Sequence, residues 1–304
     1  MLIERRSPPV GVRGFKSLPP HGLRFSKDDF ERFIYKLKFS GLSDKEVKKA
    51  ETRLTRFIEH CSYHPTYDDI IIYINELKQE FEPETVRKHV LLIKQFLKFI
   101  GAGDIADQIK LPKVPKRRKK VIKPDHIKAL LAEVNEKIDK EYLRLRLRSA
   151  ILLSATSGLR AEELYRLRLN DIDIENRTIY VRAEIAKDYE DRVTFFNLEA
   201  QEALLEYLNT KPNLDRLFSE KSIQYLFSKL NTKLRMKDMR KFFSQQSDRL
   251  GMPTAIKKIL MGHVVGYEEF VIPRGSDIDL SHYDFQDEEE LKKIYDKYWR
   301  DYQL

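Results

Sequence analysis

Two short segments in the C-terminal half of the chain place cationic side chains where they could bind a phosphate. In SGLRAEEL, Gly158 breaks one predicted helix and Arg160 stands at the start of the next. A helix start favours anions, and a guanidinium can hold a phosphate through two parallel hydrogen bonds. In KDMRKFF, Lys237 and Arg240 are three residues apart, so both project from one face of a predicted helix. Taken alone, each segment is more typical of a solvated or salt-bridged helix face.

Two further segments add a histidine and a tyrosine that could act in catalysis. LMGH places His263 just past an apolar helix and a glycine, and SHYDF contains Tyr283. A histidine at such a position is more often a structural hydrogen-bonding residue than a catalyst. One tyrosine among fifteen carries almost no information by itself. The order of the four segments is therefore more informative than any one of them.

In this order, the four segments resemble the catalytic domain of the tyrosine recombinases, the phage-type integrases. SGLRAEEL is similar to the first box of that family, in which an acid, here Glu163, follows the arginine by three residues. KDMRKFF is similar to the second box, LMGH to the third and SHYDF to the nucleophile box. The resemblance covers about residues 125–285. The catalytic side chains that it implies in these boxes are Arg160, Lys237, Arg240, His263 and Tyr283.

Two features depart from the usual family pattern. The second box begins with Lys237 where histidine is usual, which is similar to integrases of archaeal viruses and plasmids. Lysine keeps a cation near the phosphate, but its high free pKa prevents it from exchanging protons as histidine does. Tyr283 follows His263 by twenty residues, about twice the usual distance, so 264–282 must contain an extra loop or a displaced segment. Tyr267 remains the alternative nucleophile.

The family also uses a lysine on a β-hairpin. Between Lys140 and Lys211 the sequence has one lysine, Lys187, which lies at the tip of a predicted hairpin. Elimination therefore selects Lys187 for that role. The alternative is an exposed turn lysine without a part in catalysis.

The resemblance implies transesterification of a DNA phosphodiester. Arg160 and Arg240 would neutralise the two non-bridging oxygens as charge builds in the transition state. His263 would complete this cradle, with Lys237 as a further candidate. The nucleophile box would supply the phenol that attacks phosphorus and forms a covalent 3′-phosphotyrosine. The hairpin lysine would protonate the departing 5′-hydroxyl as general acid.

This scheme needs neither metal nor cofactor. The cationic side chains do what two divalent ions do in many nucleases, and the covalent ester conserves the broken bond without ATP. The sequence contains no phosphate-binding loop of the type G-x-x-x-x-G-K-[ST] and no carboxylate-rich cluster at the marked positions. We therefore expect no cofactor and no bound metal.

Helices dominate the first part of the chain. Residues 1–24 form a basic, proline-containing arm. Residues 25–109 contain about four amphipathic helices and no strand signal, with capping signals such as the box Ser43–Glu46. The resemblance identifies this region with the core-binding, DNA-binding domain of the family.

A basic linker follows at residues 110–124, which read KLPKVPKRRKKVIKP. It contains eight Lys or Arg, no acid and three prolines, and no amphipathic period survives there. We expect an extended segment that contacts the DNA backbone and makes binding strongly salt-dependent. The alternatives are a solubilising linker or a localisation tract. The candidate contacts are Lys113, Lys116, Arg117, Arg118, Lys119 and Lys120.

The remaining residues, 125–304, are predicted to form an α+β catalytic domain. Most segments have helical periodicity, and two β-rich runs, Thr178–Val181 and Val193–Phe196, suggest one long hairpin. The expected fold class is mainly α with a small β-hairpin or sheet: a helical core-binding domain followed by the catalytic domain of a tyrosine recombinase.

A C-terminal helix ends the chain within residues 286–304. The tail after Tyr283 has seven acids and four bases, so it is a poor DNA contact, and it carries an apolar helical stripe. This stripe could pack on its own domain. The resemblance instead implies docking on a neighbouring subunit, in a homotetramer on two DNA duplexes.

The amino-acid composition excludes several other classes of protein. Lys and Arg number 57 against 48 Asp and Glu, a net charge of +9 that favours a polyanionic partner. The single cysteine, Cys61, excludes a disulfide framework and a cysteine-rich zinc site. No apolar run approaches the roughly 20 residues of a membrane helix, so we expect a cytoplasmic protein.

The sequence therefore predicts a site-specific DNA recombinase acting on double-stranded DNA. A type IB topoisomerase is the first alternative, because it uses similar residues on one duplex. A non-catalytic DNA-binding protein that controls recombination is the second.

Overall fold

Capping side chains begin the first three helices of the chain. In the computed structural model, the side chains of Ser26, Ser43 and Thr66 each accept a hydrogen bond from the backbone three residues later. Pro83 occupies the first position of the fourth helix. The helices of this part are α1 (Lys27–Phe39), α2 (Asp44–Cys61), α3 (Tyr67–Glu80), α4 (Pro83–Phe99) and the short α5 (Gly103–Gln108).

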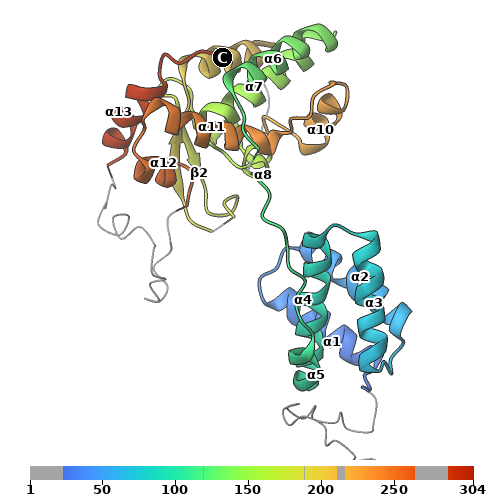
Figure 1. Cartoon of the computed structure of the whole chain (residues 1–304). Helices are drawn as coiled ribbons and strands as arrows, with labels where there is room; N and C mark the ends of the chain where they lie inside the picture. Colours follow the sequence, from blue (N-terminus) through green and yellow to red (C-terminus); the bar gives the residue numbers. More distant parts are fainter. Residues whose placement is uncertain (1–22, 119, 188, 211–215, 264–286) are drawn as a thin grey trace, which may run out of the picture. The chain divides into compact units, whose positions relative to one another are not determined.

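The structure describes residues 23–118, 120–187, 189–210, 216–263 and 287–304. The chain divides into two compact units, Met1–Arg118 and Lys119–Leu304 (Figure 1). In the first unit, aromatic rings pack between the helices. The ring centroid of Phe96 lies 5.1 Å from that of Phe25 and 5.4 Å from that of Phe33. The four predicted helices of this unit are present, and α5 is an addition whose six residues are too few to show periodicity.

Residues 110–123 contain no helix or strand among those described. Their two ends are anchored differently, because Ile109 belongs to the core of the first unit and Ile122 to that of the second. The predicted limits of the arm, the helical domain, the linker and the catalytic domain stay predictions.

The second unit is built around α7 (Glu141–Ser157), whose last eleven residues include ten that are buried. It packs closely against α9 (Leu198–Thr210) and α11 (Met236–Leu250). Because neighbours surround α7 on several sides, this end consists of small and apolar residues apart from Arg148. The other helices of the unit are α6 (Pro124–Lys137), α8 (Ala161–Arg166), α10 (Glu220–Ser228), α12 (Thr254–Leu260) and α13 (Glu288–Trp299).

A three-stranded antiparallel sheet lies beside these helices. Its order is β1 (Ile172–Asp173), β2 (Thr178–Val181) and β3 (Arg192–Phe195), with Ile179 opposite Thr194. The predicted fold class is confirmed, and the predicted hairpin is the β2–β3 pair. The sequence misses β1 because two residues, next to the turn of 3-10 helix Leu169–Asp171, cannot show a strand period.

The apolar stripe of the C-terminal helix is buried in its own unit. Tyr295 donates from its hydroxyl to the Thr156 carbonyl at 2.9 Å, and Trp299 Nε1 donates to Ser247 Oγ at 3.1 Å. The Trp299 ring also stacks on Phe243 at 5.1 Å. Burial raises the pKa of the Tyr295 phenol well above its ordinary value. The structure thus has the own-domain packing that the sequence left as one of two alternatives.

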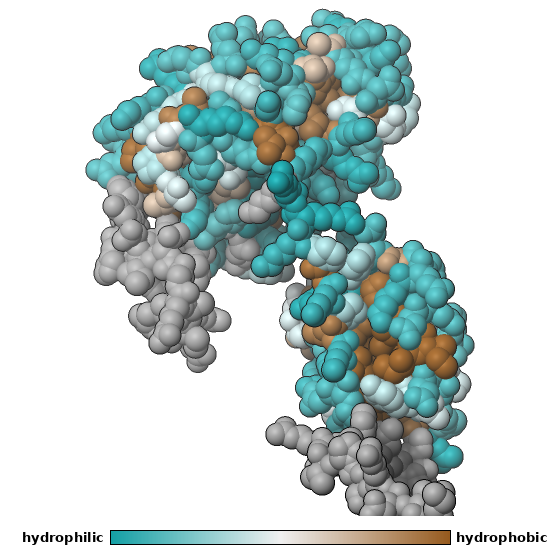
Figure 2. All heavy atoms as spheres, in the orientation of Figure 1, coloured by the Kyte–Doolittle hydropathy of each residue, from teal (hydrophilic) through white to brown (hydrophobic). Residues whose placement is uncertain are grey.

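Hydrophilic side chains cover most of the described surface of the second unit on the face that Figure 2 shows. Among the described residues, no helix combines the length and the apolar character needed to cross a membrane.

Candidate active site

The turn between α7 and α8 positions the first predicted arginine. Gly158 ends α7 in the left-handed conformation, with φ +70°. A Cβ atom at this position would lie 2.5 Å from Phe243 Cδ1, so both the backbone and the close ring require glycine. Arg160 follows as the residue that precedes α8, and 20% of its side chain is exposed.

Glu163 fixes this arginine from the first turn of α8. Its carboxylate accepts hydrogen bonds from the Arg160 backbone N–H at 2.7 Å and from Arg160 Nη1 at 2.9 Å. The Glu163 side chain is only 1% exposed. The acid that follows the arginine in the first box is therefore a buried partner of that arginine.

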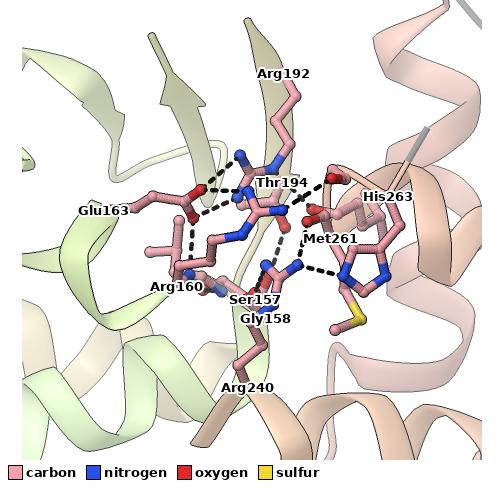
Figure 3. Close-up of polar contacts among 12 residues, drawn as sticks. Ser157, Gly158, Arg160, Glu163, Arg192, Thr194, Arg240, Met261 and His263 are labelled. Carbon is pink, nitrogen blue, oxygen red and sulfur yellow. Dashed lines mark hydrogen bonds and ion pairs between the residues drawn. The ribbon is translucent and has the colours of Figure 1, made fainter. Parts of the chain in front are cut away.

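Arg240, on α11, reaches the same place from another direction. Its Nη1 donates to the carbonyl of Gly158 at 2.7 Å, and its Nη2 donates to the carbonyl of Met261 at 2.6 Å. Nη2 also lies 2.8 Å from Nε2 of His263. Arg160 Nη2 donates to the Gly262 carbonyl at 3.1 Å, so both guanidiniums contact the turn after α12 (Figure 3).

The structure thus brings together three of the six predicted catalytic residues, Arg160, Arg240 and His263. Arginine can only donate, so the contact with Arg240 requires Nε2 of His263 to be an acceptor. A neutral imidazole with its proton on Nδ1 satisfies this requirement. Two guanidiniums and an imidazole held in this way form a preorganised site for an anion.

The two predicted lysines are both exposed. Lys187 lies in the loop between β2 and β3, and Lys237 lies in the first turn of α11. Tyr283, the alternative Tyr267 and the long segment 264–282 lie outside the described residues, so their placement stays a prediction.

One residue of the site was missed from the sequence. Arg192, the first residue of β3, donates from Nη1 and Nη2 to the two carboxylate oxygens of Glu163, at 3.1 and 2.6 Å. Its Nε donates to the Leu260 carbonyl at 3.2 Å. The sequence signal was weak, because Arg192 ends a polar stretch that is typical of an exposed turn.

The charges around Glu163 keep it ionised. Burial alone would raise its pKa, but the hydrogen bonds and charge of Arg192 and the hydrogen bonds from Arg160 lower the pKa below its ordinary value. Glu163 is therefore a buried carboxylate shared by two arginines.

The basic linker is only partly available for the predicted DNA contact. Lys113, Lys116, Arg117 and Arg118 are exposed, and Arg117 lies 3.1 Å from Glu82. Lys119 lies outside the described residues. Lys120 is also exposed, but it donates to the buried carboxylate of Asp238, in the first turn of α11, and to the carbonyl of Lys233, both at 3.1 Å.

Hydrogen bonds continue this attachment along α11. The side chain of Gln245 donates to the Lys120 carbonyl at 2.9 Å and accepts from the Ile122 N–H at 2.8 Å. Arg249 donates to the Ile122 carbonyl at 3.0 Å. Residues 120–122 are thus fixed along the helix that carries Arg240.

In the described parts of the chain, no group of three or more His, Cys, Asp or Glu could hold a metal ion.

Comparison with known proteins finds related sequences. The model of the phage integrase family matches residues 120–263. Tyrosine recombinase XerA of Saccharolobus solfataricus is 27% identical over 260 residues, covering 78% of this chain and 85% of that protein. Tyrosine recombinase XerA of Pyrococcus horikoshii is 28% identical over 198 residues, covering 64% of this chain and 66% of that protein.

Solved structures share the fold. A lambda integrase tetramer bound to a Holliday junction aligns with a TM-score of 0.62 and 15% identity, covering 82% of this chain and 80% of that one. The Tn1549 transposon integrase with circular intermediate DNA aligns with a TM-score of 0.60 and 16% identity, covering 77% and 91%.

Proposed function

Residues 120–263 match the model of the phage integrase family, and on that premise we propose that the chain is a site-specific DNA recombinase. It breaks and rejoins DNA strands through a covalent 3′-phosphotyrosine. The observation that carries the proposal is the convergence of Arg160, Arg240 and His263 on one turn, with Arg240 Nη2 2.8 Å from His263 Nε2. These residues come from three separate segments of the chain, and the fold gathers them.

The cluster suits a phosphodiester because that group is a poor electrophile until its negative charge is balanced. Charge accumulates on the non-bridging oxygens as the nucleophile approaches, and two guanidiniums stabilise that charge. His263 adds a hydrogen bond to the same group. Lys237 is a further cation for this cradle, reaching it from the first turn of α11 when DNA is bound.

We assign the nucleophile to Tyr283. Its phenolic oxygen loses its proton to water and bonds to phosphorus, the bond to the 5′-oxygen breaks, and that oxygen gains a proton. Lys187 supplies this proton as general acid. Attack by a DNA 5′-hydroxyl on the phosphotyrosine reverses the step, so the reaction conserves bond energy and needs neither metal nor ATP.

The DNA partner follows from the same scheme. The exposed cations of the linker contact the phosphate backbone, and the first unit of the chain binds the duplex beside it. Recombination joins two duplexes, so we propose a homotetramer on DNA, the assembly named for lambda integrase on a Holliday junction. We also propose that the protein works in the cytoplasm.

Two other functions use parts of this site. A type IB topoisomerase would relax one duplex as a monomer with similar side chains. A non-catalytic protein that controls recombination would bind DNA without cleaving it. The family of the chain and its recombinase relatives favour neither.

The test is trapping of the covalent intermediate. A duplex is first enriched from a random-sequence pool for binding to the full chain. It is then nicked at successive positions, so that cleavage releases a short fragment and cannot be reversed. Incubation in EDTA followed by denaturing electrophoresis detects a protein–DNA adduct. We expect an adduct with the wild type and none with Tyr283→Phe.

Each alternative gives a different result. An adduct that persists in Tyr283→Phe and disappears in Tyr267→Phe transfers the nucleophile to Tyr267. Cleavage that depends strictly on Mg²⁺ contradicts the proposed chemistry. Relaxation of supercoiled DNA by a monomer, without joining of two duplexes, supports the topoisomerase. Binding without any adduct supports the non-catalytic protein.

A further inference from the structure

We propose that Arg192 is a positioning residue that maintains the positive charge which Arg160 presents to the phosphate, by sharing the carboxylate of Glu163. This inference rests on the proposed recombinase function. Arg192 is not one of the residues that the sequence indicates for the reaction. Among the described residues, it meets the site at Glu163 and at the backbone of Leu260 and Gly262.

All three nitrogens of the Arg192 guanidinium donate a hydrogen bond. Both terminal nitrogens donate to Glu163, one to each carboxylate oxygen, and Nε donates to the carbonyl of Leu260. Only 9% of the Arg192 side chain is exposed. A buried arginine with this geometry is rigidly oriented and cannot turn toward a bound phosphate without breaking three hydrogen bonds.

Packing fixes the same side chain against the turn that precedes His263. A Cβ atom built on Gly262 would lie 2.9 Å from Arg192 Cδ and 3.1 Å from its Nε. Gly262 also has φ +64°, a conformation that glycine adopts without strain. The close approach of Arg192 therefore depends on glycine at this position. The contact holds β3 against the turn after α12, whose carbonyls accept hydrogen bonds from Arg160 and Arg240 (Figure 3).

Charge decides what this arrangement does for Arg160. The carboxylate of Glu163 carries one negative charge, and the two guanidiniums that share it carry two positive charges, so the three side chains sum to +1. If Glu163 had Arg160 as its partner alone, that pair would sum to zero. In a site with low dielectric, such a difference acts strongly on an anionic transition state.

The Glu163 carboxylate should therefore have opposite effects on the reaction rate in the presence and in the absence of Arg192. With Arg192 present, Glu163 orients Arg160 without cancelling its charge. Without Arg192, Glu163 neutralises Arg160, and removing the carboxylate should then restore activity. A residue that only stabilised the fold would not show such a reversal.

The experiment measures the single-turnover rate of adduct formation on saturating nicked duplex for four proteins: wild type, Arg192→Gln, Glu163→Gln and the double variant. We expect Arg192→Gln to be about 10- to 100-fold slower than the wild type. We expect the double variant to be faster than Arg192→Gln and close to Glu163→Gln. A double variant as slow as Arg192→Gln, or slower, overturns the proposal.

A matched control separates this effect from loss of stability. Arg177 is buried to the same degree, with 8% of its side chain exposed, and it also bonds one carboxylate, Asp296, and one carbonyl, that of Phe196. Arg177→Gln should lower the melting temperature while the rate for folded protein stays within a few-fold of the wild type. A rate loss equal to that of Arg192→Gln would assign both effects to folding and contradict the proposal.

A second variant covers the case in which Arg192→Gln does not fold. Arg192→Lys keeps the charge sum at +1, so it should remain within about tenfold of the wild type. A folded Arg192→Lys without measurable adduct overturns the charge argument. Absence of an adduct in the wild type defeats the proposed function instead, whereas equal rates in wild type and Arg192→Gln defeat this inference alone.

Discussion

Arg240 and His263 are joined directly, with Nη2 of the arginine 2.8 Å from Nε2 of the histidine. The same nitrogen donates to the Met261 carbonyl at 2.6 Å. The arginine of the second box therefore holds the backbone and the side chain of the third box together. This contact couples two residues that are 23 positions apart in the chain.

Replacement of His263 should slow the chemical step without weakening DNA binding. His263→Ala removes one hydrogen-bonding group from the phosphate site, and we expect adduct formation to fall about 10- to 100-fold. Single-turnover rates on saturating nicked duplex measure this effect. His263→Gln retains a hydrogen-bonding amide, so its rate of adduct formation should lie between those of the wild type and His263→Ala. If the loss of rate disappears at higher DNA concentration, His263 acts in binding and not in the transition state.

Gly158→Ala should destabilise the second unit more than an ordinary glycine substitution does. The new methyl group would lie 2.5 Å from the Phe243 ring, in addition to the strain of φ +70°. We expect a loss of about 2 to 4 kcal/mol in the free energy of unfolding. Gly251→Ala is the control, because it has φ +82° with nothing within 4 Å. That variant should lose only about 1 kcal/mol, and equal losses in both would contradict the role of the ring.

Lys120→Ala should reduce stability in a pH-dependent way. Burial would raise the pKa of Asp238, but the hydrogen bonds of Lys120 and Lys241 lower it below the ordinary value. The resulting stabilisation is present above the ordinary aspartate pKa of about 4 and is lost as pH falls through the lower folded-state pKa. In denaturant unfolding, the wild type should therefore have a higher free energy of unfolding than Lys120→Ala at pH 7, and the difference should shrink at acidic pH. A difference that persists unchanged at pH 3 would contradict this assignment.

Exposed and attached linker cations should differ in their effect on DNA binding. Lys116 is exposed, so Lys116→Ala should reduce the slope of log binding constant against log salt by about one and leave unfolding unchanged. Lys120 already pairs with Asp238 at 3.1 Å, so Lys120→Ala should change the slope less. Binding titrations from low to moderate salt measure both slopes. Equal changes in the two variants would show that Lys120 leaves Asp238 for the phosphate backbone.

Lys187→Ala tests the general acid in the loop between β2 and β3. The leaving 5′-oxygen needs a proton, so cleavage of ordinary nicked duplex should fall steeply, about 100-fold or more. A duplex with sulfur in place of the bridging 5′-oxygen has a leaving group that needs no proton, and it should restore the rate. Failure of that duplex to restore the rate would remove the general-acid role from Lys187.

Local patterns in the sequence were sufficient to predict most of the elements. Helix caps such as Ser43 and the β-branched runs of β2 and β3 act within a few residues, so they can be read from the sequence directly. The order of the four boxes predicted the family and three residues that the fold brings together. The sequence also predicted a catalytic role for Lys187 and Lys237. Both side chains are exposed, and that role stays a prediction.

Pairing between charged groups was decided only by the tertiary structure. The chain has 57 basic and 48 acidic residues, and nothing local shows which of them meet. Arg192 meets Glu163 across 29 positions, and Lys120 meets Asp238 across 118. A buried charge is stable only with a partner, and the fold alone supplies that partner. The sequence thus determined where the helices, the strands and the residues proposed to bind phosphate stand along the chain, while packing determined which carboxylates orient their side chains.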